Sequence, residues 1–231
     1  FKKLMGHEKY SLEVLSKIRD FRTLVNLSFV IYLSKKIGIS TQLDPVLSFP
    51  LGPNAISIME AALAYEALLT GKTYRLGAPG GTAMVPIIQK IVDRDGRTLW
   101  EYAPEPKVVL PERVTVLTSE ILRKVMERGT GKKAGDAVHV FDMPLPSFGK
   151  TGTANQFTNS SFAGLIPGPD PATGQLSIDN GYTIASYVGF DNNQPMKGDH
   201  MVLYGSFIPS LFPLLRAFRS QMVHHPQPRK C

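Results

Sequence analysis

The sequence predicts an α+β fold in which an antiparallel β-sheet is flanked by helices. Two helical patterns precede a hairpin and a third helix, a run of short strands follows from Ser147, and a last helical pattern comes near the end. Strands that are gathered in one stretch, rather than alternating with helices, favour an antiparallel sheet over a doubly wound one. The 231 residues, of which 43% are hydrophobic and 19% charged, suit a globular chain of one or two domains.

The first helix is predicted over residues 23–36, where apolar residues recur at helical spacing, the last turn is basic and Gly38 follows. Its apolar stretch, Leu24 to Leu33, is shorter than the ~18 residues that a membrane-spanning helix needs. We therefore expect a helix that packs inside the protein.

Two further helices are predicted on similar grounds. One begins near Ile56, carries apolar residues on one face and ends at Gly71. The other begins near Ser119 and ends at Gly129, because glycine commonly closes a helix. An extended connector is expected before the later helix, from Pro104 to Pro111.

Strands are predicted in two regions. A hairpin is expected between Val85 and Tyr102, because Asp95-Gly96 favours a tight turn between two extended runs. Later in the chain, Phe162–Ile166 and Tyr182–Phe190 are predicted as strands, with a loop from Pro167 to Asn180 between them.

The end of the chain is predicted to differ from the strand region before it. A last helix is expected from Phe207 to Val223, irregular in its first turns because it contains two prolines. Residues 224–231 are polar and rich in proline, which favours a frayed tail. Residues 1–223 are therefore expected to form the structured part.

Composition and motif spacing argue against several kinds of site. The net charge of +7 comes without a dense basic block, so we expect no nucleic-acid partner, and a solvated basic face explains the charge equally well. Cys231, the one cysteine, permits no internal disulfide, and the histidine spacing predicts no metal site. Three Gly-Lys dipeptides lack the earlier glycine that a phosphate-binding loop needs, and no Gly-x-Ser-x-Gly motif occurs.

The stretch from Gly149 to Thr153 carries the strongest chemical signal. Glycine and lysine are disfavoured inside strands, but Gly152 lacks the side chain that would block another backbone, so an extended peptide can pair here. Thr151 and Thr153 are two residues apart and share a face, where their hydroxyls can bind a carboxylate beside the positive charge of Lys150. Without its context, a Lys-Thr-Gly sequence is also compatible with chance.

In context, the chain resembles the transpeptidase domain of penicillin-binding proteins, most closely the class A bifunctional kind. The resemblance covers roughly residues 35–220. The matching stretches occur in the family's order: Gly38-Ile39 with Leu51-Gly52, the helix Met59–Tyr65, IVDRDGRTL (91–99), VMERGTGKKA (125–134), FGKTGTAN (148–155), Ser161–Gly164 and YVGFDNNQP (187–195).

The resemblance implies a β-lactamase/transpeptidase-like fold and a serine acyl-transfer enzyme without a cofactor. In that reaction a serine attacks the D-Ala-D-Ala carbonyl of a peptidoglycan stem peptide, and β-lactams acylate the same serine. Lys150 would polarise the site, Gly152 would admit the substrate, and Thr151 and Thr153 would bind its carboxylate, with the Thr153 N–H as an oxyanion donor. The parent protein would be membrane-anchored and act at the periplasmic, extracytoplasmic face of the inner membrane.

Two motifs depart from the family pattern. The one Ser-x-x-Lys in the chain, Ser147 to Lys150, uses the lysine of the strand motif, so we expect the nucleophile upstream of Phe1. Residues 1–223 would then be a partial transpeptidase domain, incomplete at its N-terminus. This leaves three hypotheses: a fragment of an active transpeptidase, a non-catalytic degenerate homologue that acts as a cell-wall binding or scaffold module, and an unrelated binding protein.

The second departure concerns the family's Ser-x-Asn motif. The nearest candidate is Ser11-Leu12-Glu13, in which Glu13 stands where asparagine is expected. Ser11 is therefore either a catalytic proton shuttle or an ordinary surface serine.

Overall fold

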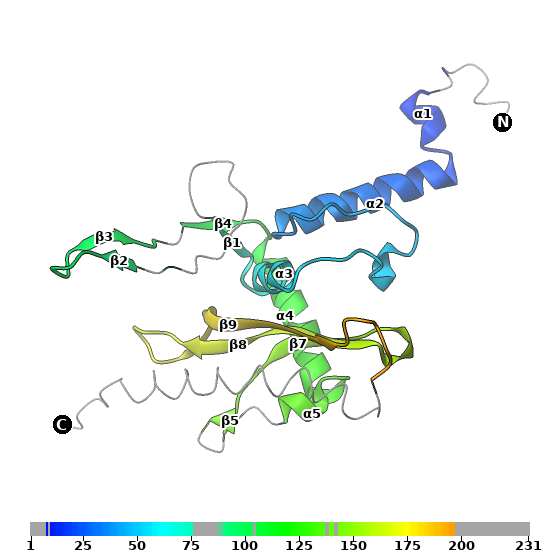
Figure 1. The fold of residues 1–231 in the computed structure, drawn as a ribbon. Helices are drawn as coiled ribbons and strands as arrows, with labels where there is room; N and C mark the ends of the chain where they lie inside the picture. Colours follow the sequence, from blue (N-terminus) through cyan, green and yellow to red (C-terminus); the bar gives the residue numbers. More distant parts are fainter. Residues whose placement is uncertain are drawn as a thin grey trace.

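The computed structural model describes residues 8, 10–75, 88, 90–103, 105–136, 139–140 and 143–196. Its helices are α1 (Leu12–Leu15), α2 (Arg19–Lys36), α3 (Ile58–Thr70), α4 (Glu112–Arg128) and α5 (Lys132–Gly135), with short 3-10 turns at Phe49–Leu51 and Asn155–Phe157 (Figure 1). Its strands are β1 (Lys72–Arg75), β2 (Lys90–Val92), β3 (Thr98–Glu101), β4 (Glu105–Val108), β5 (His139–Val140), β6 (Met143–Pro144), β7 (Phe148–Thr153), β8 (Asn159–Pro169) and β9 (Leu176–Gly189).

The three longest paired strands form the sheet that the sequence predicts. β7, β8 and β9 are antiparallel and lie in that order. The pairing of β7 with β8 is unbroken from Phe148 to Thr153, so side chains alternate regularly between the two faces. Lys150 and Gly152 therefore lie on one face, and Thr151 and Thr153 on the other. Within the described residues β7 lies at the margin of this sheet, the position that the expected pairing with an extended peptide needs.

Buried apolar side chains form one cluster on each face of the sheet. On the face of Lys150, Phe148 and Leu165 pack against Leu69 of α3 and Leu122 of α4. On the opposite face the cluster consists of Met126, Phe162, Ile166 and Ile184. α4 contributes to both clusters and so fixes the marginal strand to the rest of the core. Each fully buried apolar side chain of this size stabilises the fold by about 1.5–3 kcal/mol.

α3 begins and ends as its sequence dictates. Ser57 Oγ accepts a hydrogen bond from the Glu60 N–H at 3.1 Å, and the Glu60 carboxylate accepts one from the Ser57 N–H at 2.8 Å, which completes a capping box. The helix ends at Gly71, whose φ of +74° favours a residue without a Cβ. The predicted end at Gly71 is confirmed.

α2 is a helix, as predicted, but the expected packing is not found within the described residues. No residue of α2 is buried there; Phe29 is 58% and Leu24 47% exposed. Within the described residues the apolar side chains of α2 are thus at most half-buried, and the expected packing is not met there. None of the described helices is long and apolar enough to cross a membrane.

α4 begins at Glu112, directly after Pro111, and not near Ser119 as predicted. Three β-branched residues follow in the first turns, Val114, Thr115 and Val116, and they weaken the helical signal. The buried Thr115 hydroxyl donates to the Glu112 carbonyl at 2.8 Å, so it has a hydrogen-bond partner within the helix. The predicted end at Gly129 is confirmed.

The expected connector from Pro104 to Pro111 contains β4, which pairs with β1 so that Lys72 faces Val108. Its partner lies far earlier in the chain, where no local pattern reveals it. The Asp95-Gly96 turn is confirmed between β2 and β3, with Gly96 at a φ of +80°.

β8 and β9 are longer than predicted, and the loop between them is correspondingly shorter. β8 continues through Pro169 and β9 begins at Leu176. The intervening turn is closed by Asp170, whose carboxylate accepts hydrogen bonds from the Ala172 and Thr173 N–H groups at 2.9 Å. The predicted helix 207–223, the tail 224–231 and the part of the hairpin before residue 88 lie outside the described residues.

Candidate functional site

A cavity of about 770 Å³ lies where β7 meets α3 and the segment that precedes α3. β7 contributes Lys150, Thr151 and Gly152 to its lining, and residues 50–57 contribute the facing wall. Lys150 is the one charged side chain among the described residues that line this cavity. The cavity therefore favours an anionic ligand over a cationic one.

Lys150 is exposed and lies at the centre of β7. Its Nζ donates a hydrogen bond to the Thr151 carbonyl oxygen at 2.6 Å. Since a lysine ammonium has three N–H donors, this contact uses one of them. The side chain can thus present its charge to a ligand in the cavity while it stays attached to its own strand.

The missing side chain of Gly152 makes room for the neighbouring strand. It pairs with Ser161 of β8, and a Cβ built at Gly152 would collide with Ser161 Oγ. Both residues line the cavity. The sequence predicted room for a substrate backbone here; the structure adds a reason for glycine within the sheet itself.

The two threonines of β7 differ in their surroundings. Thr151 is half-buried and lines the cavity, and its Oγ1 lies 2.7 Å from Thr130 Oγ1. Thr153 is exposed at the end of β7 and is not among the described residues that line the cavity. Sequence analysis did not single out Thr130, although the Gly-Thr-Gly run at 129–131 lies within one of the matched stretches.

Ser11 lies apart from this cavity. It is the N-cap residue of α1, where its Oγ accepts a hydrogen bond from the Val14 N–H at 3.4 Å. α1 lies at the end of α2 that points away from the sheet (Figure 1). The structure therefore brings Lys150, Thr151 and Gly152 together, but it does not bring Ser11 to them.

The wall that faces β7 is held in place by a buried carboxylate. Glu60 is 6% exposed, and it accepts hydrogen bonds at 2.6–2.8 Å from the N–H groups of Ser40, Thr41 and Ser57. The hydroxyls of the same three residues also donate to it, at 2.8–3.0 Å. Sequence analysis missed this cluster because its two halves are about twenty residues apart.

The hydrogen bonds determine the ionisation of Glu60. Burial by itself raises the pKa of its carboxyl group, but the bonds from Ser57, Thr41 and Ser40 together outweigh burial and hold the pKa well below its usual range. Glu60 is therefore ionised at neutral pH, and it ties the segment at 40–41 to the start of α3.

Comparison with known proteins adds independent information. The chain is 33% identical to penicillin-binding protein 1A of Aquifex aeolicus (strain VF5) over 144 residues, which is 62% of this chain and 18% of that protein. It is 28% identical to penicillin-binding protein 1B of Escherichia coli (strain K12) over 172 residues, 74% of this chain and 17% of that protein. The chain is related to the class A penicillin-binding proteins.

A third relative extends the match over more of the chain. Penicillin-binding protein 1B of Buchnera aphidicola subsp. Baizongia pistaciae (strain Bp) is 24% identical over 202 residues, 84% of this chain and 25% of that protein. The chain thus spans a quarter or less of the length of these penicillin-binding proteins. No protein-family model matches it. The antiparallel sheet with helices on both faces is consistent with the α+β fold of this family.

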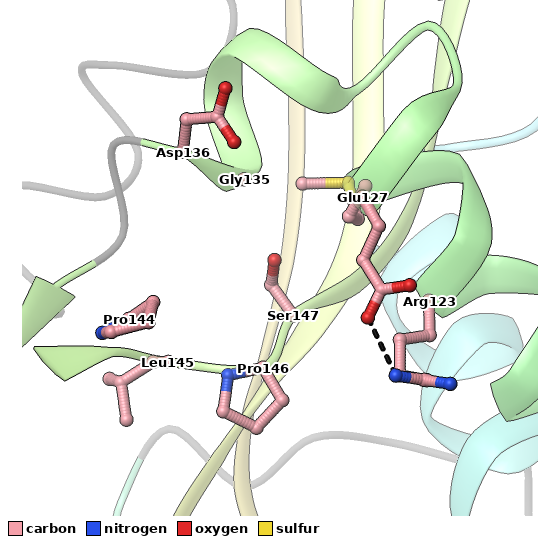
Figure 2. A pocket seen from close by; sticks show the side chains of 9 residues that line it. Arg123, Glu127, Gly135, Asp136, Pro144, Leu145, Pro146 and Ser147 are labelled. Atoms are coloured by element: carbon pink, nitrogen blue, oxygen red, sulfur yellow. Dashed lines mark hydrogen bonds and ion pairs between the residues drawn. The ribbon is translucent and has the colours of Figure 1, made fainter.

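In a relative of the penicillin-binding proteins, the Ser147–Lys150 spacing invites comparison with the Ser-x-x-Lys motif. Ser147 is buried and lines a second cavity, of about 560 Å³, beside α4 and α5. Figure 2 shows its hydroxyl pointing into that cavity, near the ion pair of Arg123 and Glu127. Ser147 and Lys150 line different cavities, so this serine is not placed to react beside Lys150. In the described part of the chain, no group of three or more His, Cys, Asp or Glu could hold a metal ion.

Proposed function

We propose that this chain is the C-terminal part of a serine D,D-transpeptidase that binds penicillin and cross-links peptidoglycan stem peptides by acyl transfer from D-Ala-D-Ala. The observation that carries the proposal is the position of β7. Lys150, Thr151 and Gly152 lie at the margin of the sheet and line a cavity whose charge favours an anion. The relatives are named for penicillin binding, which supports the same ligand class here.

The proposed chemistry assigns one role to each residue of the strand. The extended stem peptide pairs with the free edge of β7, which Gly152 leaves accessible. Its terminal carboxylate accepts hydrogen bonds from the Thr151 and Thr153 hydroxyls, and the Lys150 ammonium, which starts from the other face of the same strand, adds positive charge at the edge. The Thr153 N–H donates to the carbonyl oxygen as negative charge develops on it.

The covalent step needs a serine nucleophile, for which the single Ser-x-x-Lys of this sequence, Ser147 to Lys150, is not the candidate that we propose. The serine oxygen bonds to the carbonyl carbon of the penultimate D-Ala, and the bond to the terminal D-Ala breaks. The leaving amine takes up the proton that the serine hydroxyl loses. In the second step the nitrogen of an acceptor stem-peptide amine bonds to the same carbonyl carbon, the ester bond to the serine oxygen breaks, and that oxygen takes up the proton that the amine loses. We expect the isolated chain to form no covalent penicillin adduct. A role for Ser11 as proton shuttle stays a prediction, as do a membrane-anchored parent protein and a periplasmic location.

A second candidate function is a non-catalytic wall-binding or scaffold module. Two observations favour it: Glu13 stands where the family motif has asparagine, and Ser147 lines a different cavity from Lys150. The coding sequence upstream of this chain distinguishes the two candidates. An in-frame Ser-x-x-Lys there supports the enzyme, and its absence supports the scaffold.

Substitution of Lys150 tests the proposed function in the complete protein. We expect Lys150→Ala to lower the rate of covalent labelling by fluorescent penicillin by about 100-fold or more, because proton transfer and carboxylate binding both lose the ammonium group. The fold should be retained, since Lys150 is exposed.

Lys107→Ala is the matched control, because Lys107 is an exposed lysine on a strand of a different sheet. The control should be labelled at the parent rate. A Lys150→Ala protein that is labelled as fast as the parent would remove the proposed mechanism.

A further inference from the structure

We propose that Thr130 is a positioning residue, whose hydroxyl orients the Thr151 hydroxyl toward the carboxylate of the substrate. The inference rests on the proposed function, because it concerns the same site. It adds to the proposed site a residue from the turn after α4, outside the Lys-Thr-Gly strand.

The contact between the two hydroxyls is the first observation. Thr130 Oγ1 and Thr151 Oγ1 are 2.7 Å apart, a normal distance for an O–H···O hydrogen bond. A hydroxyl has one donor and two acceptor lone pairs. When Thr130 donates, the Thr151 oxygen is the acceptor, and the Thr151 O–H is left to donate to a ligand. Because a carboxylate can only accept hydrogen bonds, its binding favours the arrangement in which Thr130 donates to Thr151 and Thr151 donates to the carboxylate.

The second observation is that the turn carrying Thr130 is held rigidly. The N–H groups of Gly129 and Gly131 both donate to the Val125 carbonyl, at 3.0 and 3.1 Å. A Cβ at Gly129 would lie 2.9 Å from the Val125 Cα and carbonyl oxygen, and one at Gly131 would lie 2.6 Å from Met126 Sδ. Glycine on both sides of Thr130 is therefore what lets the turn fold against the end of α4.

The third observation is that α4 is itself anchored to the sheet. Met126, one turn before Thr130, is 2% exposed and packs with Phe162 of β8. Phe162 pairs with Thr151 in the sheet register. A continuous packed path thus joins the backbone of Thr130 to the backbone of Thr151, so the fold holds the two threonines close together before a ligand arrives. Such preorganisation lowers the entropic cost of binding.

The test compares variants of the complete protein by the rate of covalent labelling with fluorescent penicillin and with its methyl ester. Thr130→Val keeps the shape of the side chain and removes the hydroxyl, whereas Thr130→Ser keeps the hydroxyl. Thr118→Val is the matched control, because Thr118 lies on α4 and its hydroxyl donates to the Val114 carbonyl of the same helix. Circular dichroism and thermal unfolding check that each variant folds.

We expect Thr130→Val to slow labelling by the free acid roughly 3- to 10-fold, the effect of one lost hydrogen bond, while Thr130→Ser and Thr118→Val react at the parent rate. With the methyl ester, which has no carboxylate, parent and Thr130→Val should react equally. Equal rates with the free acid, or the same slowing with both reagents, would overturn the inference and leave the proposed function standing. A parent protein that is not labelled at all would overturn the proposed function and the inference with it. If Thr130→Val does not fold, Thr130→Ala takes its place. It should be labelled more slowly than the parent by the free acid and at the parent rate by the methyl ester, and any other result overturns the inference.

Discussion

Gly152 shows how one position can serve two neighbours. Its missing Cβ makes room for Ser161 Oγ on β8. Under the proposed function, the same missing Cβ also admits the guest backbone. The two effects can be separated, because Ser161 Oγ is the far end of a flexible side chain. Replacing Ser161 by alanine removes the clash with a side chain at position 152 and leaves the access of a guest backbone to β7 unchanged.

The double variant Gly152→Ala/Ser161→Ala separates the two effects. Gly152→Ala should destabilise the protein by about 1–3 kcal/mol through overpacking and should also slow penicillin labelling. Adding Ser161→Ala should restore the free energy of unfolding but not the labelling rate, because the new methyl group still faces the guest. Denaturant unfolding and labelling are measured on the same samples, with Ser161→Ala as the control. Labelling that recovers in the double variant would show that the glycine serves β8 and not a substrate.

At the residue scale, the sequence predicted the members of the site that lie next to one another in the chain. Lys150 and Thr151 carry a recognisable motif, and their lining of the cavity follows from the strand that holds them. Thr130 and Glu60 were missed, because each acts through a contact with a distant segment. Nothing in the local pattern around a buried glutamate says where its hydrogen-bond donors come from.

At the scale of elements, the wall of the cavity opposite β7 depends on Glu60. Its carboxylate ties Ser40 and Thr41 to the first turn of α3, and the loop between these points lines the cavity. This loop contains a 3-10 turn, and little of it is buried. The hydrogen bonds at its two ends therefore contribute much of what holds it in place.

Glu60→Gln should reduce the free energy of unfolding by about 1–3 kcal/mol at pH 7, because an amide replaces a charged acceptor and leaves some of the donors of Ser40, Thr41 and Ser57 without a protein acceptor. The pKa of Glu60 is lowered in the folded state, so its stabilising effect is complete above the ordinary glutamate pKa of about 4.3. That effect decreases as the pH falls below this value, since the unfolded chain takes up a proton that the folded chain does not. The difference between parent and variant should therefore shrink in acid.

Urea unfolding at pH 7 and near pH 4 measures this difference. Glu101→Gln is the control, because Glu101 is exposed on β3. A Glu60→Gln protein as stable as the parent at pH 7, or a difference that stays constant in acid, would contradict this account of the wall.

Some helices and strands were predicted from local signals in the sequence, and others were missed or predicted too short. α3 and the turn between β2 and β3 carry local signals, an apolar face that ends at Gly71 and an Asp-Gly pair, and the end of α3 and the turn are found where expected. β4 was missed because its pairing with β1 is not local. α4 was predicted too short because β-branched residues mask the first turns of a helix whose stability comes from packing.

For the molecule as a whole, the central feature is a strand that lies at the margin of the sheet formed by the described residues. α3 packs on one face of this sheet and α4 contributes to the clusters on both faces, and β7 carries a lysine, two glycines and two threonines. The sequence predicted this margin from the poor strand propensity of Gly149 to Thr153, since residues that weaken a strand need another reason to be there.

The most direct test is a crystal structure of the complete protein acylated by penicillin. The account predicts that the acyl group lies along the free edge of β7, with its carboxylate on the Thr151 and Thr153 hydroxyls and its carbonyl oxygen on the Thr153 N–H. An acyl group bound elsewhere, or a β7 whose outer edge is already paired with another strand of the same protein, would contradict it.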